Sequence, residues 1–220
     1  MGGDFFMKLI TFIQTNQVEI LGSLLQHIQL VVTSILIGIL ISIPVGIILS
    51  RHKRAAAPVL TAVGVIQTIP GLVMLGFALL LFGTGTLPAL VVLSVYSILP
   101  ILRNTYTGIT GVDAAILEAG KGIGMTKTQI LFKVQLPLAT ASIISGIRIS
   151  TVYIVSWATL AGLIGAGGLG DLIWTGLSTY NTNYILAGAI PSAVLAFLFS
   201  GLIGLLQRFI TPRGLRSEKV

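Results

Sequence analysis

The sequence predicts an all-α membrane protein, and its composition carries most of that prediction. Of its 220 residues, 55% are hydrophobic and only 9% are charged, and the mean hydropathy is +1.02. A soluble domain carries about 25% charged residues, so this composition excludes a soluble enzyme and equally a disordered or fibrous protein. The chain has no cysteine, which excludes disulfides, thiolate metal sites and thiol nucleophiles. Its charged residues stand between long apolar stretches, and a helix needs about 20 such residues to cross a hydrocarbon core.

Counting those stretches predicts about five transmembrane helices. They are 28–50, two helices within 55–102 on either side of the Gly-Thr turn at 83–86, about 137–163, and 184–207. Glycine and threonine interrupt a run of Leu, Val and Ile at that turn, so we expect a tight reversal between the second and third spans. The segment 4–26 before the first span is either a short interfacial helix on the outer leaflet or a frayed terminus.

The positions of the basic residues predict the orientation. Eleven of the 13 Lys and Arg residues follow the first, third or fifth span, whereas Lys8 stands alone on the other side and Arg148 lies inside the fourth span. The cytoplasmic side of a membrane protein carries the excess of Lys and Arg, so we expect the N-terminus outside and the C-terminus in the cytoplasm. The net charge of +7 is dispersed rather than gathered on one basic face, which favours lipid and argues against nucleic acid as a partner.

The cytoplasmic loop of about 104–136, between the third and fourth spans, is too long for a simple turn. Asp113 and the alanine-rich run after it predict a helix that extends to about Lys121. Gly122 and Gly124 offer the positive-φ positions at which helices end. We therefore expect the first half of this loop to be a short helix that stops at a glycine elbow.

A second short helix is predicted directly after that elbow. Thr126 and Gln129 form a capping-box pattern, and Met125 and Ile130 occupy the two positions of a hydrophobic staple. We expect this helix to stop before Pro137, because proline disfavours α geometry in the residue that precedes it. The loop is thus predicted to be a helix, an elbow and a second helix beneath the membrane.

This loop is either a polar connector lying on the headgroups or a docking element for a cytoplasmic partner. Glu118 is the one acidic residue between 114 and 131, and it stands among the small residues Ala115, Ala119 and Gly120. Small residues would let a partner surface approach closely, and a single charge would orient it.

The same residues resemble a known motif. Glu118-Ala119-Gly120 is followed by Gly124 and, after nine further residues, by Val134-Gln135-Leu136-Pro137. This pattern resembles the EAA motif of ABC importer permeases, with Gly120 in place of alanine and Val134 in place of isoleucine. Four other stretches resemble the permease subunits of osmoprotectant importers, which carry glycine betaine, carnitine and choline. They are Gln67-Thr68-Ile69-Pro70, Leu99-Pro100-Ile101-Leu102-Arg103-Asn104-Thr105, Gly146-Ile147-Arg148 and Ile164-Gly165-Ala166-Gly167-Gly168-Leu169-Gly170.

That resemblance covers about 26–209 and implies a type I ABC importer permease in the bacterial plasma membrane, with 1–220 forming one permease domain. It implies three kinds of protein partner: a second permease, identical or a close homologue, a cytoplasmic ABC ATPase dimer, and an extracytoplasmic substrate-binding protein. The helix that carries Glu118 would be the coupling helix. The residues implied to contact the ATPase are Glu118, Ala119, Gly120, Gly124, Met125 and Thr126.

The chain contains no G-x-x-x-x-G-K-[ST] pattern, so we expect it to be no enzyme and to bind no cofactor. ATP and Mg²⁺ would be held by the ATPase partner. A glycine pattern at 165–170 satisfies G-x-G-x-x-G, but it follows an apolar helix rather than a strand. We interpret it as a flexible outer turn, which the resemblance places where the binding protein docks.

The candidates for the translocation path are Gln67, Tyr96, Arg148, Tyr153 and Trp157. The three aromatic residues could make cation–π contacts with a trimethylammonium group, although packing between spans is the commoner reason for such side chains. A cation as deep as Arg148 usually faces a bundle interior or an aqueous cavity, where it could meet a substrate carboxylate. It could instead snorkel or bond neighbouring serines.

Three alternatives remain open at this point. The first is a permease of the same fold for another small substrate, such as methionine or ergothioneine. The second is a secondary carrier or channel, which would need carboxylates or ion sites within the membrane, yet no Asp or Glu lies in any predicted span. The third is a structural scaffold, which leaves the cytoplasmic loop unexplained.

Overall fold

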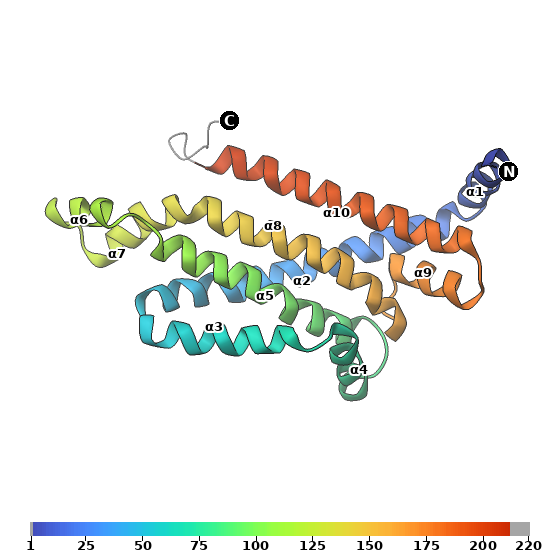
Figure 1. Cartoon of the computed structure of the whole chain (residues 1–220), viewed down its shortest axis with the longest axis horizontal. Coiled ribbons are helices and arrows are strands. Elements are labelled where there is room, and N and C mark those ends of the chain that lie inside the picture. Colours follow the sequence, from blue (N-terminus) through green and yellow to red (C-terminus); the bar gives the residue numbers. More distant parts are fainter. Residues whose placement is uncertain (1, 212–220) are drawn as a thin grey trace.

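The computed structural model describes residues 2–211, with side chains from residue 7 onward, and every regular element in that part of the chain is helical. The elements are α1 (Gly2–Thr15), α2 (Gln17–Arg51), α3 (Lys53–Thr68), α4 (Gly71–Phe82), α5 (Thr86–Thr110), α6 (Ala114–Gly122), α7 (Lys127–Ile130), a π-helical turn (Leu131–Gln135), α8 (Leu136–Leu160), a 3₁₀ turn (Ala161–Ile164), α9 (Leu169–Ser178) and α10 (Thr182–Ile210). The long helices lie side by side, with α6 and α7 at one end of the bundle and α1 and α9 at the other (Figure 1). The predicted all-α class is confirmed.

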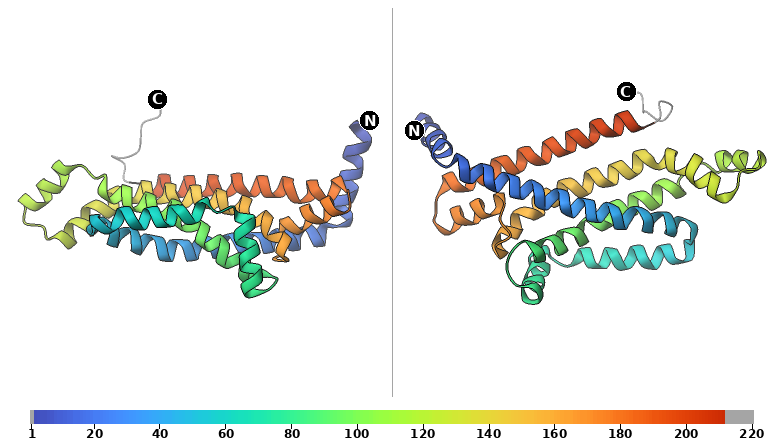
Figure 2. Two further views of the ribbon diagram at one scale, coloured as in Figure 1. Left: turned by 60° about the horizontal axis from the view of Figure 1, so that its bottom comes forward. Right: turned by 180° about the vertical axis from the view of Figure 1, so that it is seen from behind.

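Within the described residues, four helices are long and apolar enough to cross a membrane, and a bent pair raises the number to five. The four are α2, α5, the run Lys127–Ile164 and α10. The bent pair is α3 with α4, which meet at 89°. The second span is therefore not one continuous helix: it breaks at Ile69 and Pro70, because the proline ring supplies no N–H to continue the helix. Figure 2 shows α4 turning away from α3 in both views.

The first span is also longer than predicted, since α2 begins at Gln17 rather than near residue 28. Before it, α1 is a helix from Gly2, so of the two alternatives for this segment the structure has a helix rather than a frayed end. The ring of Phe12 on α1 meets that of Tyr184 on α10 edge to face, with centroids 4.8 Å apart. The predicted cytoplasmic cations Arg213, Arg216 and Lys219 lie outside the described residues.

Small residues allow α2 to pack closely against α5 at the centre of the bundle. On α2, Ser34, Gly38, Ser42 and Gly46 recur at every fourth position and are all buried. A β-carbon on Gly38 would lie 2.0 Å from the Oγ of Ser97 on α5, which no side chain could tolerate. Such small-residue ladders are the usual means by which membrane helices approach one another. A small residue also allows α8 to approach α5 closely, because a β-carbon on Gly146 would lie 2.8 Å from a backbone oxygen of α5.

The helix after the elbow does not stop before Pro137, so that prediction is wrong. Instead α7 passes through the π-helical turn and runs directly into α8, whose first turn contains Pro137. In the π turn the N–H of Leu136 donates to the oxygen of Leu131, one residue further back than in an α-helix. This wider turn accommodates a proline, which would otherwise clash with the carbonyl four residues before it. Helix α5 continues to Thr110 and α7 begins at Lys127, so residues 111–126, which include α6, connect the two helices. This connection is shorter than the predicted loop of about 104–136.

Candidate functional site

The helix α6 is held at both ends by local hydrogen bonds. At its start, the side chain of Asp113 accepts a hydrogen bond of 2.9 Å from the N–H of Ala115 and so caps the helix, which begins one residue after Asp113. At its end, Gly124 has a φ of 81° and its N–H donates to the oxygen of Lys121. The N–H of Met125 donates to the oxygen of Gly120. These two bonds form a Schellman motif, in which only a glycine adopts the positive φ without strain.

Gly122 does not have the positive φ that the sequence suggested, because it is the last residue of α6 and lies in the helix itself. The elbow therefore depends on Gly124 alone. After it, the hydroxyl of Thr126 accepts a hydrogen bond from the N–H of Gln129, whose side chain in turn accepts from the N–H of Thr126. This reciprocal capping box is the one predicted from the sequence.

The two short helices fold against each other at Gly120. This glycine is buried, and a β-carbon on it would lie 3.5 Å from the sulfur of Met125 and 3.6 Å from a side-chain carbon of Ile130. Ile130 is buried in turn, so the staple residues hold the elbow closed from within. The hairpin is thus a small unit with its own apolar contact, projecting beyond the spans (Figures 1 and 2).

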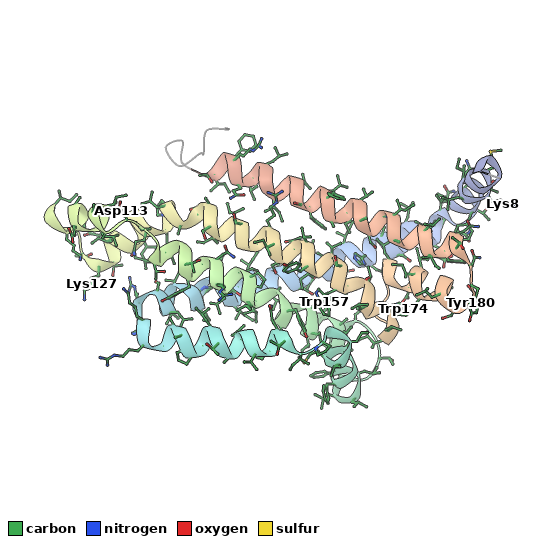
Figure 3. All side chains as sticks on the ribbon, in the orientation of Figure 1. Lys8, Asp113, Lys127, Trp157, Trp174 and Tyr180 are labelled. Atoms are coloured by element: carbon green, nitrogen blue, oxygen red, sulfur yellow. The ribbon has the colours of Figure 1, made fainter. Side chains whose placement is uncertain are left out.

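The outer face of this hairpin leaves apolar side chains exposed beside the charges of Glu118 and Lys121. Glu118, Ala119 and Lys121 are exposed, Ile116 is 45% exposed, and Ile123 at the elbow is 81% exposed. Large apolar side chains exposed next to charged groups are typical of a contact surface. All six residues predicted for ATPase contact, 118–120 and 124–126, thus belong to one compact hairpin, which lies at the end of the bundle marked by Asp113 and Lys127 in Figure 3.

At the break between α3 and α4, the structure brings together three of the five path candidates. The amide of Gln67 donates a hydrogen bond of 2.7 Å to the backbone oxygen of Tyr96, and the hydroxyl of Tyr96 donates to the oxygen of Ile69. The ring of Tyr96 stacks on that of Trp157, with centroids 4.9 Å apart and 22° between the planes. Trp157 occupies the space next to Gly71, where a β-carbon would lie only 1.4 Å from the indole (Figure 3). The cluster therefore holds the bend in place by satisfying the backbone groups that the bend frees.

The other two path candidates lie elsewhere on α8, and both are exposed. Arg148 is exposed and its Nε donates a hydrogen bond of 2.8 Å to the hydroxyl of Ser200 on α10. Tyr153 is 56% exposed and lies on the same helix one and a half turns further on. Tyr153 and Trp157 are four residues apart, a spacing that puts two residues on one helix face, but only Trp157 joins the aromatic cluster. The expected bond from Arg148 to a neighbouring serine is present.

Sequence reasoning missed the residues that fix the opposite end of the bundle. The backbone N–H of Gly168 donates to the side-chain oxygen of Gln26 on α2, at 3.1 Å. The buried His27 places its Nε2 3.1 Å from the oxygen of Val155. The only signal in the sequence was the glycine-rich stretch itself, because partners more than a hundred residues apart leave no local pattern. Within the described residues, no three His, Asp or Glu side chains gather at a site that could hold a metal ion.

Comparison with known proteins agrees with this geometry. Residues 34–213 match the family model described as the binding-protein-dependent transport system inner membrane component. The chain belongs to this family. The match includes every residue of the α6–α7 hairpin and all five path candidates, and it identifies the chain as a transport permease subunit.

Relatives in this family match the chain over nearly its whole length. The choline transport system permease protein OpuBB of Bacillus subtilis (strain 168) is 45% identical over 211 residues, which cover 96% of this chain and 97% of that protein. The glycine betaine/carnitine/choline transport system permease protein OpuCB of the same organism is 45% identical over 212 residues, which cover 96% and 98%. The carnitine transport permease protein OpuCB of Listeria monocytogenes is 42% identical over 211 residues, which cover 96% and 97%.

Solved structures confirm the fold. An inward-facing structure of the MetNI methionine ABC transporter contains a chain that superposes with a TM-score of 0.80 at 22% sequence identity, covering 89% of this chain and 98% of that one. A crystal structure of an amino acid ABC transporter with histidines gives a TM-score of 0.75 at 20% identity, covering 91% and 97%. The predicted type I ABC importer permease fold is confirmed.

Proposed function

We propose that this chain forms the translocation path of an ATP-driven importer for quaternary-ammonium solutes such as glycine betaine, carnitine and choline, which a binding protein delivers. The observation that carries the proposal is the 45% identity to OpuBB and OpuCB over almost the full length of each, since their names specify these solutes. Methionine or another amino acid is supported less well, because the transporters of such solutes share only 20–22% identity with this chain and so support the fold alone.

In the proposed importer, two permeases meet in the bacterial plasma membrane, with the N-terminus outside and the α6–α7 hairpin in the cytoplasm. The hairpin inserts into a cytoplasmic ATPase dimer, and that dimer holds ATP and Mg²⁺. Support comes from the exposed residues Glu118, Ile116 and Ile123, which lie on a hairpin that is capped at both helices and projects from the end of the bundle. Because α7 continues into α8 without a break, a displacement of the hairpin would be passed along a single helix to the middle of the membrane.

The middle of that helix carries the proposed path residues. Arg148 and Tyr153 are exposed on α8, whereas the exposed residues in the middle of α10, such as Phe197 and Leu198, are apolar. A charge exposed within a span faces water or protein in preference to lipid, so we place the path beside α8, where Arg148 bonds Ser200, and lipid beside the apolar residues of α10. Gln67, Tyr96 and Trp157 then act by holding the bend beside this path, where Trp157 is only partly buried.

Reconstitution tests the proposal. The two permeases, the ATPase and the binding protein are assembled in liposomes, and ATP hydrolysis is measured with glycine betaine, carnitine, choline and methionine in turn. We expect a quaternary-ammonium solute to stimulate hydrolysis and to accumulate. Glu118→Lys should lower the stimulated rate at least about tenfold, since reversing a charge at the centre of an interface is strongly unfavourable.

Glu19→Lys is the matched control, because Glu19 is also an exposed glutamate, on α2 at the end of the bundle that carries α9, where it accepts a hydrogen bond from the hydroxyl of Tyr184. It should leave the stimulated rate near that of the wild type. Equal coupling in the Glu118→Lys and wild-type importers would contradict the role of the hairpin. Solute uptake by the permease alone in ATP-free liposomes would instead support a secondary carrier.

A further inference from the structure

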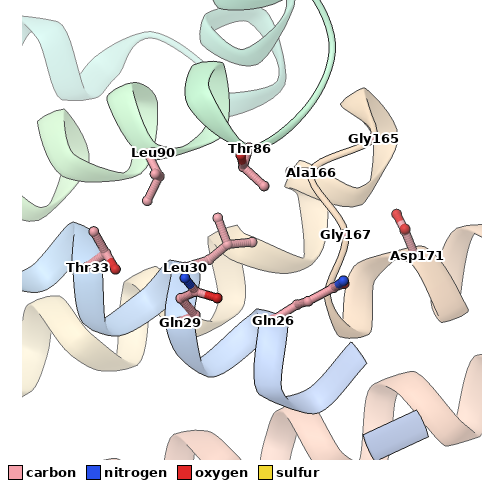
Figure 4. Close-up of a pocket in the computed structure, with 10 residues that line it drawn as sticks. All are labelled: Gln26, Gln29, Leu30, Thr33, Thr86, Leu90, Gly165, Ala166, Gly167 and Asp171. Atoms are coloured by element: carbon pink, nitrogen blue, oxygen red, sulfur yellow. The ribbon is translucent and has the colours of Figure 1, made fainter. Parts of the chain in front are cut away.

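A pocket of about 510 Å³ opens at the end of the bundle opposite the α6–α7 hairpin (Figure 4). Its walls come from three regions that are distant in sequence: α2, the start of α5, and the glycine-rich loop 165–167 with the first turn of α9. Pockets that hold small molecules have volumes of about 300–1,000 Å³. This one is therefore large enough for a small organic solute.

Asp171 is the one charged residue among those that line the pocket. Its side chain extends from the first turn of α9 beside the glycine loop (Figure 4). No hydrogen bond or ion pair joins this carboxylate to another residue of the described chain, and partial burial raises its pKa above the ordinary value. A desolvated carboxylate without a partner is a site at which a positive charge is favoured.

The rest of the lining lacks a counter-charge but offers apolar contact. Leu30 and Leu90 present methyl groups from α2 and α5, while Gln29 and Thr33 contribute polar groups on the α2 side. A quaternary ammonium carries a permanent charge and no N–H donor, so it is attracted by a carboxylate and makes van der Waals contact through its methyl groups. No aromatic ring lines this pocket, so the strong cation–π term that gives tight ammonium sites their affinity is absent.

The pocket wall is held in a fixed position. The oxygen of the Gln26 side chain accepts the N–H of Gly168, and the N–H of Gly85 donates to the oxygen of Ile164 at 2.9 Å. These bonds fasten the glycine loop to α2 on one side and to the turn before α5 on the other. The three glycines 165, 167 and 168 all have positive φ, so the chain bends around the cavity rather than across it.

We propose that this pocket is a low-affinity entry subsite, in which the Asp171 carboxylate attracts the ammonium end of the solute before it enters the membrane path. The choice of solute class and the outward position of the pocket rest on the proposed function. Affinity is weak because one partly exposed carboxylate supplies the attraction, and weak affinity suits a site that must release its solute onward.

Direct binding measurement tests the subsite. The complete permease–ATPase complex is purified without its binding protein, and the binding of radiolabelled choline at millimolar concentration is followed by scintillation proximity. Asp171→Asn keeps the size of the side chain and removes its charge. We expect it to weaken choline binding about fivefold, the factor that a single ion pair in water contributes.

Two variants complete the experiment. Asp171→Glu keeps the charge and should retain binding, and Glu19→Gln removes a charge at the same end of the bundle but outside the pocket and should have no effect. Choline binding that is the same in Asp171→Asn and wild type overturns the proposal. A second result would also overturn it: the wild-type complex binds no choline, and Asp171→Asn weakens attachment of the binding protein. In that case a basic side chain of the binding protein, rather than the solute, would occupy the pocket.

Transport assays on the same preparations keep this proposal separate from the proposed function. If the wild-type importer transports a quaternary-ammonium solute and Asp171→Asn binds choline normally, only the subsite is wrong. If it transports none of these solutes, the proposed function is wrong, and loss of choline binding in Asp171→Asn would still identify the pocket as a site for small cations.

Discussion

The two ends of the bundle are built by different kinds of contact. The α6–α7 hairpin is held by hydrogen bonds between residues two to five positions apart, such as those of Asp113, Gly124 and Thr126. The end that carries α9 is held by contacts across the whole chain, including Gln26 with Gly168 and a close approach of α9 to α8. The hairpin can therefore be altered without disturbing the spans, whereas a change beside α9 should affect the entire bundle.

The largest expected effect follows from Gly170→Leu at the α9 end. A β-carbon on Gly170 would lie 2.2 Å from the backbone oxygen of Thr159, so the helices must separate. We expect the free energy of unfolding to fall by about 3 kcal/mol, measured as a lower temperature at which the permease loses its monodisperse peak in detergent. Gly201→Leu is the control, because nothing lies within 4 Å of a β-carbon there. Equal losses in the two variants would show that α9 is not tightly packed on α8.

A smaller effect, confined to the hairpin, is expected from Gly124→Ala. Its φ of 81° is unfavourable for alanine by about 1–2 kcal/mol, so the elbow should open and solute-stimulated ATP hydrolysis should fall several-fold. The melting temperature of the bundle should not change, because the elbow lies outside the spans.

The neighbouring Gly122→Ala provides the matched comparison for that variant. Gly122 is helical and its β-carbon position is open, so alanine should be tolerated or should stabilise α6. If both glycine variants lose coupling equally, backbone conformation at the elbow is not the cause.

Thr126→Ala should have a still smaller effect at the same site. It removes the side chain that accepts the N–H of Gln129, which is worth about 1 kcal/mol in a helix cap. We expect faster amide hydrogen exchange at Gln129, with unchanged exchange in the spans. Thr128→Ala, which alters a threonine inside α7 that makes no cap, should leave that exchange rate as it is.

The smallest expected effect is a pH dependence at the α9 end. Burial raises the pKa of Asp171. When the pH is lowered, this carboxylate therefore becomes protonated at a higher pH than an ordinary aspartate does. Choline binding to the pocket should therefore fall as the pH is lowered through that raised pKa, and it should be restored on returning to neutral pH.

The Asp171→Asn variant should show no such pH dependence in choline binding. It should also be slightly more stable than the wild type at neutral pH, since a group with a raised folded pKa stabilises the fold only in its protonated form. His27 behind Gly168 and Glu19 further along α2 are the other titratable groups on the facing helix. A pH profile that survives in Asp171→Asn would assign the titration to one of them.

The contrast between the two ends also explains which features could be predicted from the sequence. The capping box at Thr126 and the start of a helix near Asp113 were predicted correctly because each depends on residues within three positions of one another. The stop before Pro137 was predicted wrongly, because a local rule on proline gives no weight to the buried contacts of Leu131 and Ala139 with the end of α5. Those contacts hold the chain helical, and a π turn absorbs the strain.

The aromatic candidates illustrate the same limit. Spacing alone grouped Tyr153 with Trp157, since residues four apart share a helix face. The structure instead pairs Trp157 with Tyr96, because Gly71 leaves room for the indole beside the bend of α3 and α4. Which side chain fills that space depends on a glycine 86 positions away in the sequence.

The sequence by itself determined that the protein is helical, that it belongs in lipid and that a capped hairpin interrupts its spans, because composition, charge spacing and capping act over a few residues. The tertiary structure alone decided how sharply the second span bends, by 89°, the placement of Arg148 at an exposed position and the pocket beside Asp171. Each of these depends on which helices lie side by side, and the small residues that allow close approach do not specify the partner helix.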